Sequence, residues 1–96
     1  MKLIQLLENI EYTCVQGSLE TDVKSVVYDS RKVEKDSLFL CIKGAVSDGH
    51  KYAEEVVRKG ASVLVVQDPV PVPEGVTVIR VADSRYAMAC ISAAWF

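Results

Sequence analysis

The sequence lacks the features that mark several large classes of protein. Its 96 residues carry 11 lysines and arginines against 13 aspartates and glutamates, which gives a formal net charge of −2. The absence of a basic surplus argues against nucleic acid as a partner. No apolar run approaches the roughly 20 residues of a membrane span, and the N-terminal one, residues 3–7, is too short for the core of a signal peptide. We therefore expect a cytoplasmic protein without a membrane partner.

Metal-binding and nucleophilic residue types are also scarce. The three cysteines lie far apart at positions 14, 41 and 90, no C-x-x-C pair occurs, and His50 is the single histidine. Zinc is usually held by four such side chains, so we expect no metal site. We expect the cysteines to be unpaired, small core residues in a reducing compartment. A lone histidine without a nucleophile nearby is a poor catalytic candidate, and no catalytic residue is predicted.

The composition is that of one soluble globular domain, residues 1–96. Half of the residues are hydrophobic and a quarter are charged, and no internal repeat occurs. A chain of this length buries only about 60–65% of its unfolded surface. A large ligand would therefore bind at the edge of the fold.

The pattern of apolar residues predicts an α/β fold with a small mixed sheet, a βαβ crossover and flanking helices. Short apolar or β-branched runs predict strands at residues 12–15, 23–28, 38–42, 63–66 and 76–81. Helical spacing predicts helices at residues 2–8, over residues 50–59 with Gly60 as the terminator, and after Asp83 as the N-cap. The unit from residue 38 to residue 66 reads as a βαβ crossover with parallel strands. The chain stops inside the last helical pattern, which suggests a fragment of a longer protein.

Two loops that follow apolar strands are the candidate binding segments. One is Asp29-Ser30-Arg31, and the other is the glycine-flanked stretch at residues 44–50. Ligands of open α/β sheets bind outside the carboxyl ends of strands, and the second loop opens a helix whose free N–H groups favour an anion. The hydroxyls of Ser30 and Ser47 would then help to hold a diphosphate. The alternative is that both loops are ordinary turns.

Several separated motifs resemble the N-terminal domain of the Mur ligases, in the same order and over nearly the whole chain. They are YDSRKV at residues 28–33, LFLCIKG at residues 38–44, DGH at residues 48–50 and GA at residues 60–61. The segment VADSRYAMA at residues 81–89 is similar to the V-x-D-x-R-x-A-(L/M)-A stretch of the UDP-N-acetylmuramoyl-tripeptide synthetases of that family.

The resemblance implies the first of three domains. In the family this domain binds the UDP moiety of UDP-N-acetylmuramoyl-dipeptide, the central domain carries the ATP P-loop, and the third receives the amino acid. The substrate carboxylate becomes an acyl phosphate that the amine attacks, and magnesium accompanies the ATP. This chain has no G-x-x-x-x-G-K-[ST] motif, because the glycine spacing of residues 44–49 continues as His50-Lys51 without a hydroxyl. We therefore expect no cofactor here, the central domain as a missing partner, and no ligation by the isolated chain.

Position by position, the resemblance places the UDP site at Tyr28 and Ser30 and at Ala45, Val46 and Ser47. The Ser30 hydroxyl would donate to a phosphate or uracil oxygen, or would bond its own turn. Tyr28 stands where some members have leucine and would pack on the uracil, or would be an ordinary strand aromatic. Ala45 and Val46 replace polar residues of other members and leave only backbone contacts. The Ser47 hydroxyl would replace the polar side-chain contacts that Ala45 and Val46 lack, or Ser47 would be a solvated loop residue.

The flanking residues are expected to support the site. Arg31 would lie near a phosphate or, as we favour, pair with Asp29 to hold the turn. Asp48 is expected to cap the start of the following helix. Gly49 lies beside that cap, and His50 is expected to pack over the loop.

Two other functions stay open on the sequence. Within the family, the synthetase that adds the D-Ala-D-Ala dipeptide shares the DSR and DGH motifs; the YDSRK run and the closing D-x-R-x-A helix favour the tripeptide enzyme. Outside it, the chain would be a free-standing α/β module that binds a nucleotide or a protein without chemistry. The added amino acid, diaminopimelate or lysine, is read by the third domain, so the sequence leaves it open, along with the oligomeric state.

Overall fold

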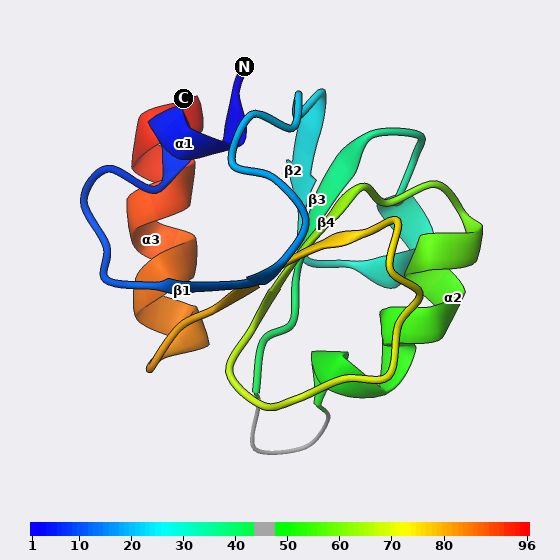
Figure 1. The fold of residues 1–96 in the computed structure, drawn as a ribbon. Coiled ribbons are helices and arrows are strands. Elements are labelled where there is room, and N and C mark those ends of the chain that lie inside the picture. Colours follow the sequence, from blue (N-terminus) through cyan, green and yellow to red (C-terminus); the bar gives the residue numbers. More distant parts are fainter. Residues whose placement is uncertain (44–47) are drawn as a thin grey trace.

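A computed structural model describes residues 1–43 and 48–96 of the chain. Its strands form one sheet in the order β1-β5-β4-β3-β2, with helices on both faces (Figure 1). The elements are α1 (Leu3–Leu6), β1 (Thr13–Gln16), β2 (Ser25–Val27), the 3-10 helix η1 (Ser30–Lys32), β3 (Ser37–Leu40), the 3-10 helix η2 (Gly49–Tyr52), α2 (Ala53–Arg58), β4 (Val63–Val66), β5 (Thr77–Arg80) and α3 (Ser84–Trp95). Over the described ranges, every helix is too short or too polar to cross a membrane.

The sheet is mixed, and the predicted crossover is confirmed. Strands β2 to β5 are parallel, whereas β1 runs antiparallel beside β5. Leu38 of β3 lies opposite Val63 of β4, and α2 joins the two strands. The carboxyl ends of four strands therefore point to one edge of the sheet, and the segments that follow these strands begin there.

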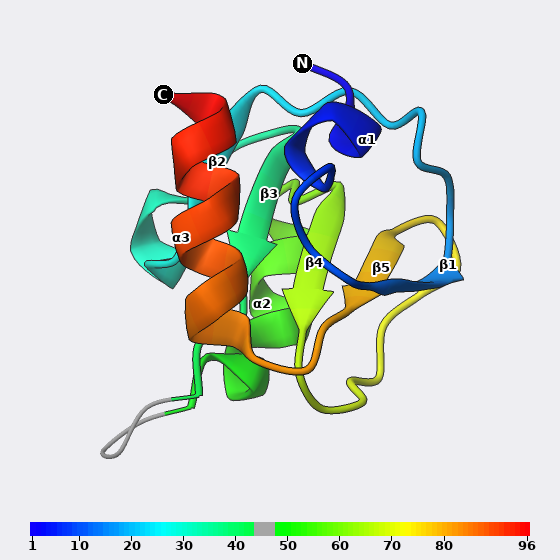
Figure 2. The same cartoon turned by 90° about the vertical axis from the view of Figure 1, so that its left-hand side faces the viewer.

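Two apolar layers fill the spaces on either side of the sheet. Figure 2 shows α1 and α3 in front of the sheet and α2 behind it. Leu38 and Leu40 belong to the core under α1 and α3, while Phe39 between them belongs to the core under α2. All three side chains are fully buried. A strand with helices on both faces buries side chains on both, which explains the uninterrupted apolar runs in the sequence.

The predicted helix boundaries at Gly60 and Asp83 are confirmed. Gly60 follows α2 with φ +112°, and a Cβ there would lie 2.8 Å from the Cα of Lys35. A side chain is therefore excluded by both conformation and contact. At α3, the Asp83 carboxylate accepts hydrogen bonds from the backbone N–H groups of Arg85 and Tyr86, at 2.9 and 3.2 Å. These bonds satisfy two of the free N–H groups in the first turn.

The expectation that all three cysteines are core residues is wrong for Cys14. Cys41 is buried and Cys90 is half-buried, but Cys14 is exposed. The reason is its position in β1, an edge strand with three exposed residues of four, Thr13, Cys14 and Val15. Burial raises the pKa of the Cys41 thiol to about 12, so this thiol stays protonated at neutral pH.

Candidate functional site

An open pocket of about 660 Å³ lies at the carboxyl ends of β2 and β3. We call it the edge pocket; it is lined by Tyr28, Asp29, Ser30, Arg31, Ile42, Gly49, Tyr52 and Glu55. The structure thus brings the Asp29-Ser30-Arg31 turn next to Gly49, which starts the turn before α2. The predicted contacts of Ala45, Val46 and Ser47 lie outside the described residues.

The turn after β2 is held by an aspartate–arginine pair. Asp29 caps η1 by accepting the Arg31 backbone N–H at 3.0 Å, and it receives the guanidinium Nε and Nη2 at 3.0 and 2.8 Å. Hydrogen bonds from the Arg31 side chain and backbone lower the pKa of Asp29 to about 2. The favoured interpretation of this pair, that it holds the turn, is therefore confirmed. The Arg31 side chain nevertheless stays 85% exposed beside the pocket.

Ser30 lies in the middle of this turn, and its backbone is fixed from another element. Its carbonyl accepts a hydrogen bond from Lys59 Nζ at 3.0 Å. Among the described residues, the Ser30 hydroxyl makes no hydrogen bond, so it does not bond its own turn. The hydroxyl therefore remains available to a ligand in the edge pocket.

Two tyrosines line the edge pocket, and only one of them was predicted. Tyr28 is 67% exposed just beyond β2, whereas Tyr52 is half-buried at the end of η2. The Lys51 ammonium lies 5.1 Å from the centroid of the Tyr52 ring. The sequence predicted a helix over this segment and did not single out Tyr52, Ile42 or Glu55. The available signal was the three-residue spacing of Tyr52 and Glu55, which puts them on the same side of the helix start.

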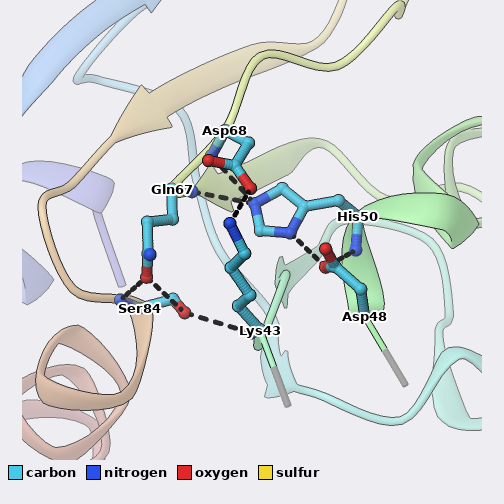
Figure 3. Close-up of polar contacts among 6 residues, drawn as sticks. All are labelled: Lys43, Asp48, His50, Gln67, Asp68 and Ser84. Carbon is cyan, nitrogen blue, oxygen red and sulfur yellow. Dashed lines mark hydrogen bonds and ion pairs between the residues drawn. The ribbon is translucent and has the colours of Figure 1, made fainter. Parts of the chain in front are cut away.

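A polar network joins the ends of the central strands next to this pocket (Figure 3). We call it the His50 network; its members are Lys43, Asp48, His50, Gln67, Asp68 and Ser84. The Nε2 atom of His50 accepts hydrogen bonds from the backbone N–H groups of Gln67 and Asp68, at 2.9 and 3.1 Å. Backbone N–H groups only donate, so Nε2 carries no proton and the ring is the neutral Nδ1–H tautomer. The Nδ1–H group donates to the Asp48 carboxylate at 2.5 Å.

The network continues from β4 to the start of α3 and back to β3. Gln67 Oε1 accepts from the N–H and the hydroxyl of Ser84, at 3.0 and 3.2 Å. The Ser84 hydroxyl oxygen accepts the Lys43 backbone N–H at 3.3 Å, and Lys43 Nζ pairs with Asp68 at 2.9 Å. The segments that follow β3, β4 and β5 are thereby tied together.

Asp48 has the capping role predicted for it, whereas the prediction that His50 packs over the loop falls on residues 44–47, which lie outside the described residues. The Asp48 carboxylate accepts the backbone N–H of His50 at 2.9 Å, which caps η2. Hydrogen bonds from the backbone and ring of His50 lower the pKa of the Asp48 carboxyl. Gly49 between them donates its N–H to the Ile42 carbonyl at 2.9 Å, and a Cβ on Gly49 would lie 2.9 Å from the Ile42 nitrogen. The close approach of two backbones therefore requires glycine at this position.

The side chains of Asp48, His50 and Asp68 could be mistaken for a metal site. One ligand atom from each lies within 4.8 Å of the others. However, a metal at Nδ1 would move the ring proton to Nε2, where it would face the two N–H donors of Gln67 and Asp68. Lys43 already supplies a cation to Asp68. The arrangement is therefore that of a hydrogen-bonded network and not of a metal centre.

Comparison with known proteins identifies the family. The family described as "Mur ligase family, catalytic domain" matches residues 22–95. The chain belongs to the Mur ligase family. The resemblance predicted from the separated motifs is therefore confirmed.

The most similar relatives carry one and the same activity in their names. The chain is 46% identical over 92 residues to the UDP-N-acetylmuramoyl-L-alanyl-D-glutamate–2,6-diaminopimelate ligase of Clostridioides difficile strain 630, covering 96% of this chain and 19% of that protein. It is 41% identical over 96 residues to the ligase of the same name from Geobacillus kaustophilus, covering 100% of this chain and 19% of the relative. The chain thus spans about a fifth of the length of these relatives.

Solved structures of the family share the fold. MurF from Acinetobacter baumannii superimposes with a TM-score of 0.83 at 28% identity, over 97% of this chain and 20% of that chain. MurF from Thermotoga maritima, solved in complex with ADP, gives a TM-score of 0.63 at 23% identity over 73% of this chain and 16% of that chain. The second likeness concerns the fold alone.

Proposed function

We propose that this chain is the N-terminal, UDP-binding domain of an ATP-dependent ligase that adds the third amino acid to UDP-N-acetylmuramoyl-L-Ala-D-Glu in peptidoglycan synthesis. The observation that carries the proposal is the edge pocket, where Tyr28, Ser30 and Gly49 meet at the carboxyl ends of parallel strands. The names of the relatives support the substrate and favour 2,6-diaminopimelate as the added amino acid.

The proposed contacts follow from the side chains that line the pocket. The uracil would pack against the exposed Tyr28 ring, with Tyr52 on the opposite element. The Ser30 hydroxyl would face the diphosphate. The negative charges of the two acidic residues in the pocket are neutralised by neighbouring cations, because Asp29 pairs with Arg31 and a Glu55 oxygen lies 3.6 Å from Lys59 Nζ. Backbone N–H groups of residues 45–47 complete the proposed site.

ATP and magnesium would act on other domains of the parent enzyme, in the cytoplasm. The chain carries no phosphate-binding G-x-x-x-x-G-K-[ST] motif, and formation of an acyl phosphate requires such a loop in this family. We therefore propose that residues 1–96 bind the substrate's nucleotide end without catalysing ligation, and that the central ATP-binding domain and the C-terminal domain complete the enzyme.

The main alternative is the first domain of the ligase that adds D-Ala-D-Ala, because MurF from A. baumannii has this fold over 97% of the chain. The identities favour the first proposal, at 46% for a diaminopimelate ligase against 28% for MurF. An assay of ADP release by the full-length parent separates the two. The first proposal expects ligation with UDP-N-acetylmuramoyl-dipeptide and a free amino acid, and the alternative expects it with the tripeptide and D-Ala-D-Ala.

The binding site is tested by a two-dimensional amide NMR titration of the chain with UDP and then with UDP-N-acetylmuramoyl-L-Ala-D-Glu. We expect shifts concentrated at residues 28–31 and 49–52. Ser30→Ala should weaken binding by about ten- to a hundredfold, the worth of one hydrogen bond to a charged group. Ser92→Ala on α3, which covers the other face of the sheet, is the matched control and should bind as wild type. Shifts located elsewhere, or none in either the chain or the full-length parent, would refute the proposal.

A further inference from the structure

The His50 network connects the edge pocket to strands that do not line it. His50 belongs to η2, the same turn as Gly49 and Tyr52, which form one wall of the pocket. Its ring is only 8% exposed, and its Nε2 atom points toward Gln67 and Asp68, which follow β4 (Figure 3). The two hydrogen bonds at Nε2 fix η2 to the backbone at residues 67 and 68, so the ring sets the position of the pocket wall.

We propose that His50 is a positioning residue for nucleotide binding: its unprotonated Nε2 holds the Gly49–Tyr52 wall of the edge pocket against the end of β4. This inference rests on the proposed function of the pocket. His50 itself contacts no ligand, and Tyr52 is placed through it.

The acceptor at Nε2 decides whether this connection exists. Without it, the N–H groups of Gln67 and Asp68 would lose both hydrogen bonds to the ring. The proposal therefore expects nucleotide binding to weaken when the side chain at position 50 offers these N–H groups no acceptor.

The charged groups around the ring come from three segments. The Asp48 carboxylate accepts from Nδ1, and the Asp68 carboxylate has an oxygen within 4.8 Å of a ring nitrogen. Lys43, after β3, neutralises Asp68 at 2.9 Å. The Cys41 thiol beneath stays neutral, because burial raises its pKa to about 12. The Nδ1 side of the ring is thus bound to Asp48, and the Nε2 side makes the contact with the backbone that follows β4.

Two substitutions distinguish the nitrogen atoms of the ring. In His50→Gln, the side-chain oxygen reaches the position of Nε2 and accepts from the same N–H groups. In His50→Asn, the shorter side chain can reach Asp48 but leaves the two N–H groups without an acceptor. Arg58→Ala, at an exposed position of α2 that does not line the edge pocket, serves as the matched control.

The experiment measures the Kd of UDP-N-acetylmuramoyl-L-Ala-D-Glu at pH 7.5 by amide NMR, together with the thermal midpoint of each variant. Arg58→Ala should bind as wild type. For His50→Asn we expect about three- to tenfold weaker binding, the effect of losing about one hydrogen bond. His50→Gln should restore nearly wild-type binding.

The outcomes separate this inference from the proposed function. If wild type does not bind the ligand at pH 7.5, the proposed function fails, and the inference fails with it. If wild type binds and His50→Gln binds as weakly as His50→Asn, an acceptor at the position of Nε2 does not place the pocket wall, and the inference fails. Equal binding by His50→Asn and wild type at pH 7.5 would overturn the inference as well, whether or not the thermal midpoint changes.

Discussion

Replacing Gly49 by alanine tests the geometry on which the edge pocket depends. The added Cβ would lie 2.9 Å from the Ile42 nitrogen and 3.2 Å from the Cys41 Cα, closer than ordinary van der Waals contact. Both neighbouring atoms belong to backbone and cannot rotate away. The end of β3 and the start of η2 must therefore separate, which also weakens the hydrogen bond from the Gly49 N–H to the Ile42 carbonyl.

The size of the effect follows from these two losses. Overpacking of a well-packed site costs about 1–3 kcal/mol, and a backbone hydrogen bond contributes about 1 kcal/mol. We expect Gly49→Ala to lower the free energy of unfolding by roughly 2–3 kcal/mol. In a domain of this size, each kcal/mol shifts the thermal midpoint by about 4–8 °C, so the midpoint should fall by roughly 10–20 °C.

Thermal unfolding followed by circular dichroism measures this change. Gly75→Ala is the matched control, because nothing lies within 4 Å of a Cβ at that position. It should change the free energy of unfolding by less than about 1 kcal/mol, in the stabilising direction. A Gly49→Ala midpoint equal to that of wild type would show that β3 and η2 do not approach each other as described.

Three further predictions concern the core, the turn and the thiols. Phe39→Ala should lower the free energy of unfolding by about 3–5 kcal/mol in urea titrations, because this fully buried ring fills the core under α2. The pKa of Asp29 is lowered to about 2, so its pair with Arg31 should stabilise the fold fully above the pKa of an unfolded aspartate, near 3.9, and less as the pH falls toward 2. The difference in thermal midpoint between wild type and Asp29→Asn should therefore shrink as the pH falls from about 4 to 2. A difference that stays constant over this range would contradict the prediction. Alkylation at pH 8, followed by mass spectrometry, should modify the exposed Cys14 in the native state and Cys41 only after unfolding, and rapid native modification of Cys41 would contradict its burial.

The elements that the sequence predicted well are those fixed by local patterns. β4 was predicted at its observed limits, residues 63–66, because an apolar run between a glycine-terminated helix and a polar residue leaves few alternatives. The Asp83 cap was predictable because a side chain and the N–H groups two and three residues later form a local motif. The aspartate–arginine pair at residues 29 and 31 is local in the same way.

The features that were missed depend on contacts between distant segments. Cys14 was assigned to the core because its run is apolar, and only the sheet order shows that β1 is an edge strand. The His50 network joins residues that lie 17 and 41 positions from each other along the chain. No spacing in the sequence indicates that Gln67, Ser84 and Lys43 meet. Tyr52 and Glu55 line the pocket because strand pairing across the sheet brings Tyr28, at the end of β2, beside the start of α2.

The position of β1 has a consequence for the order in which the fold can be assembled during synthesis. β1 is made first among the strands, yet its partner in the sheet is β5, with Thr13 opposite Arg80. The pairs of β2 with β3 and of β3 with β4 use segments that leave the ribosome earlier. The nascent chain must therefore hold β1 unpaired until residues 77–80 emerge. A ribosome stalled before that point would expose the side of β4 that β5 covers in the complete sheet, together with the unpaired β1, and both favour association with other chains.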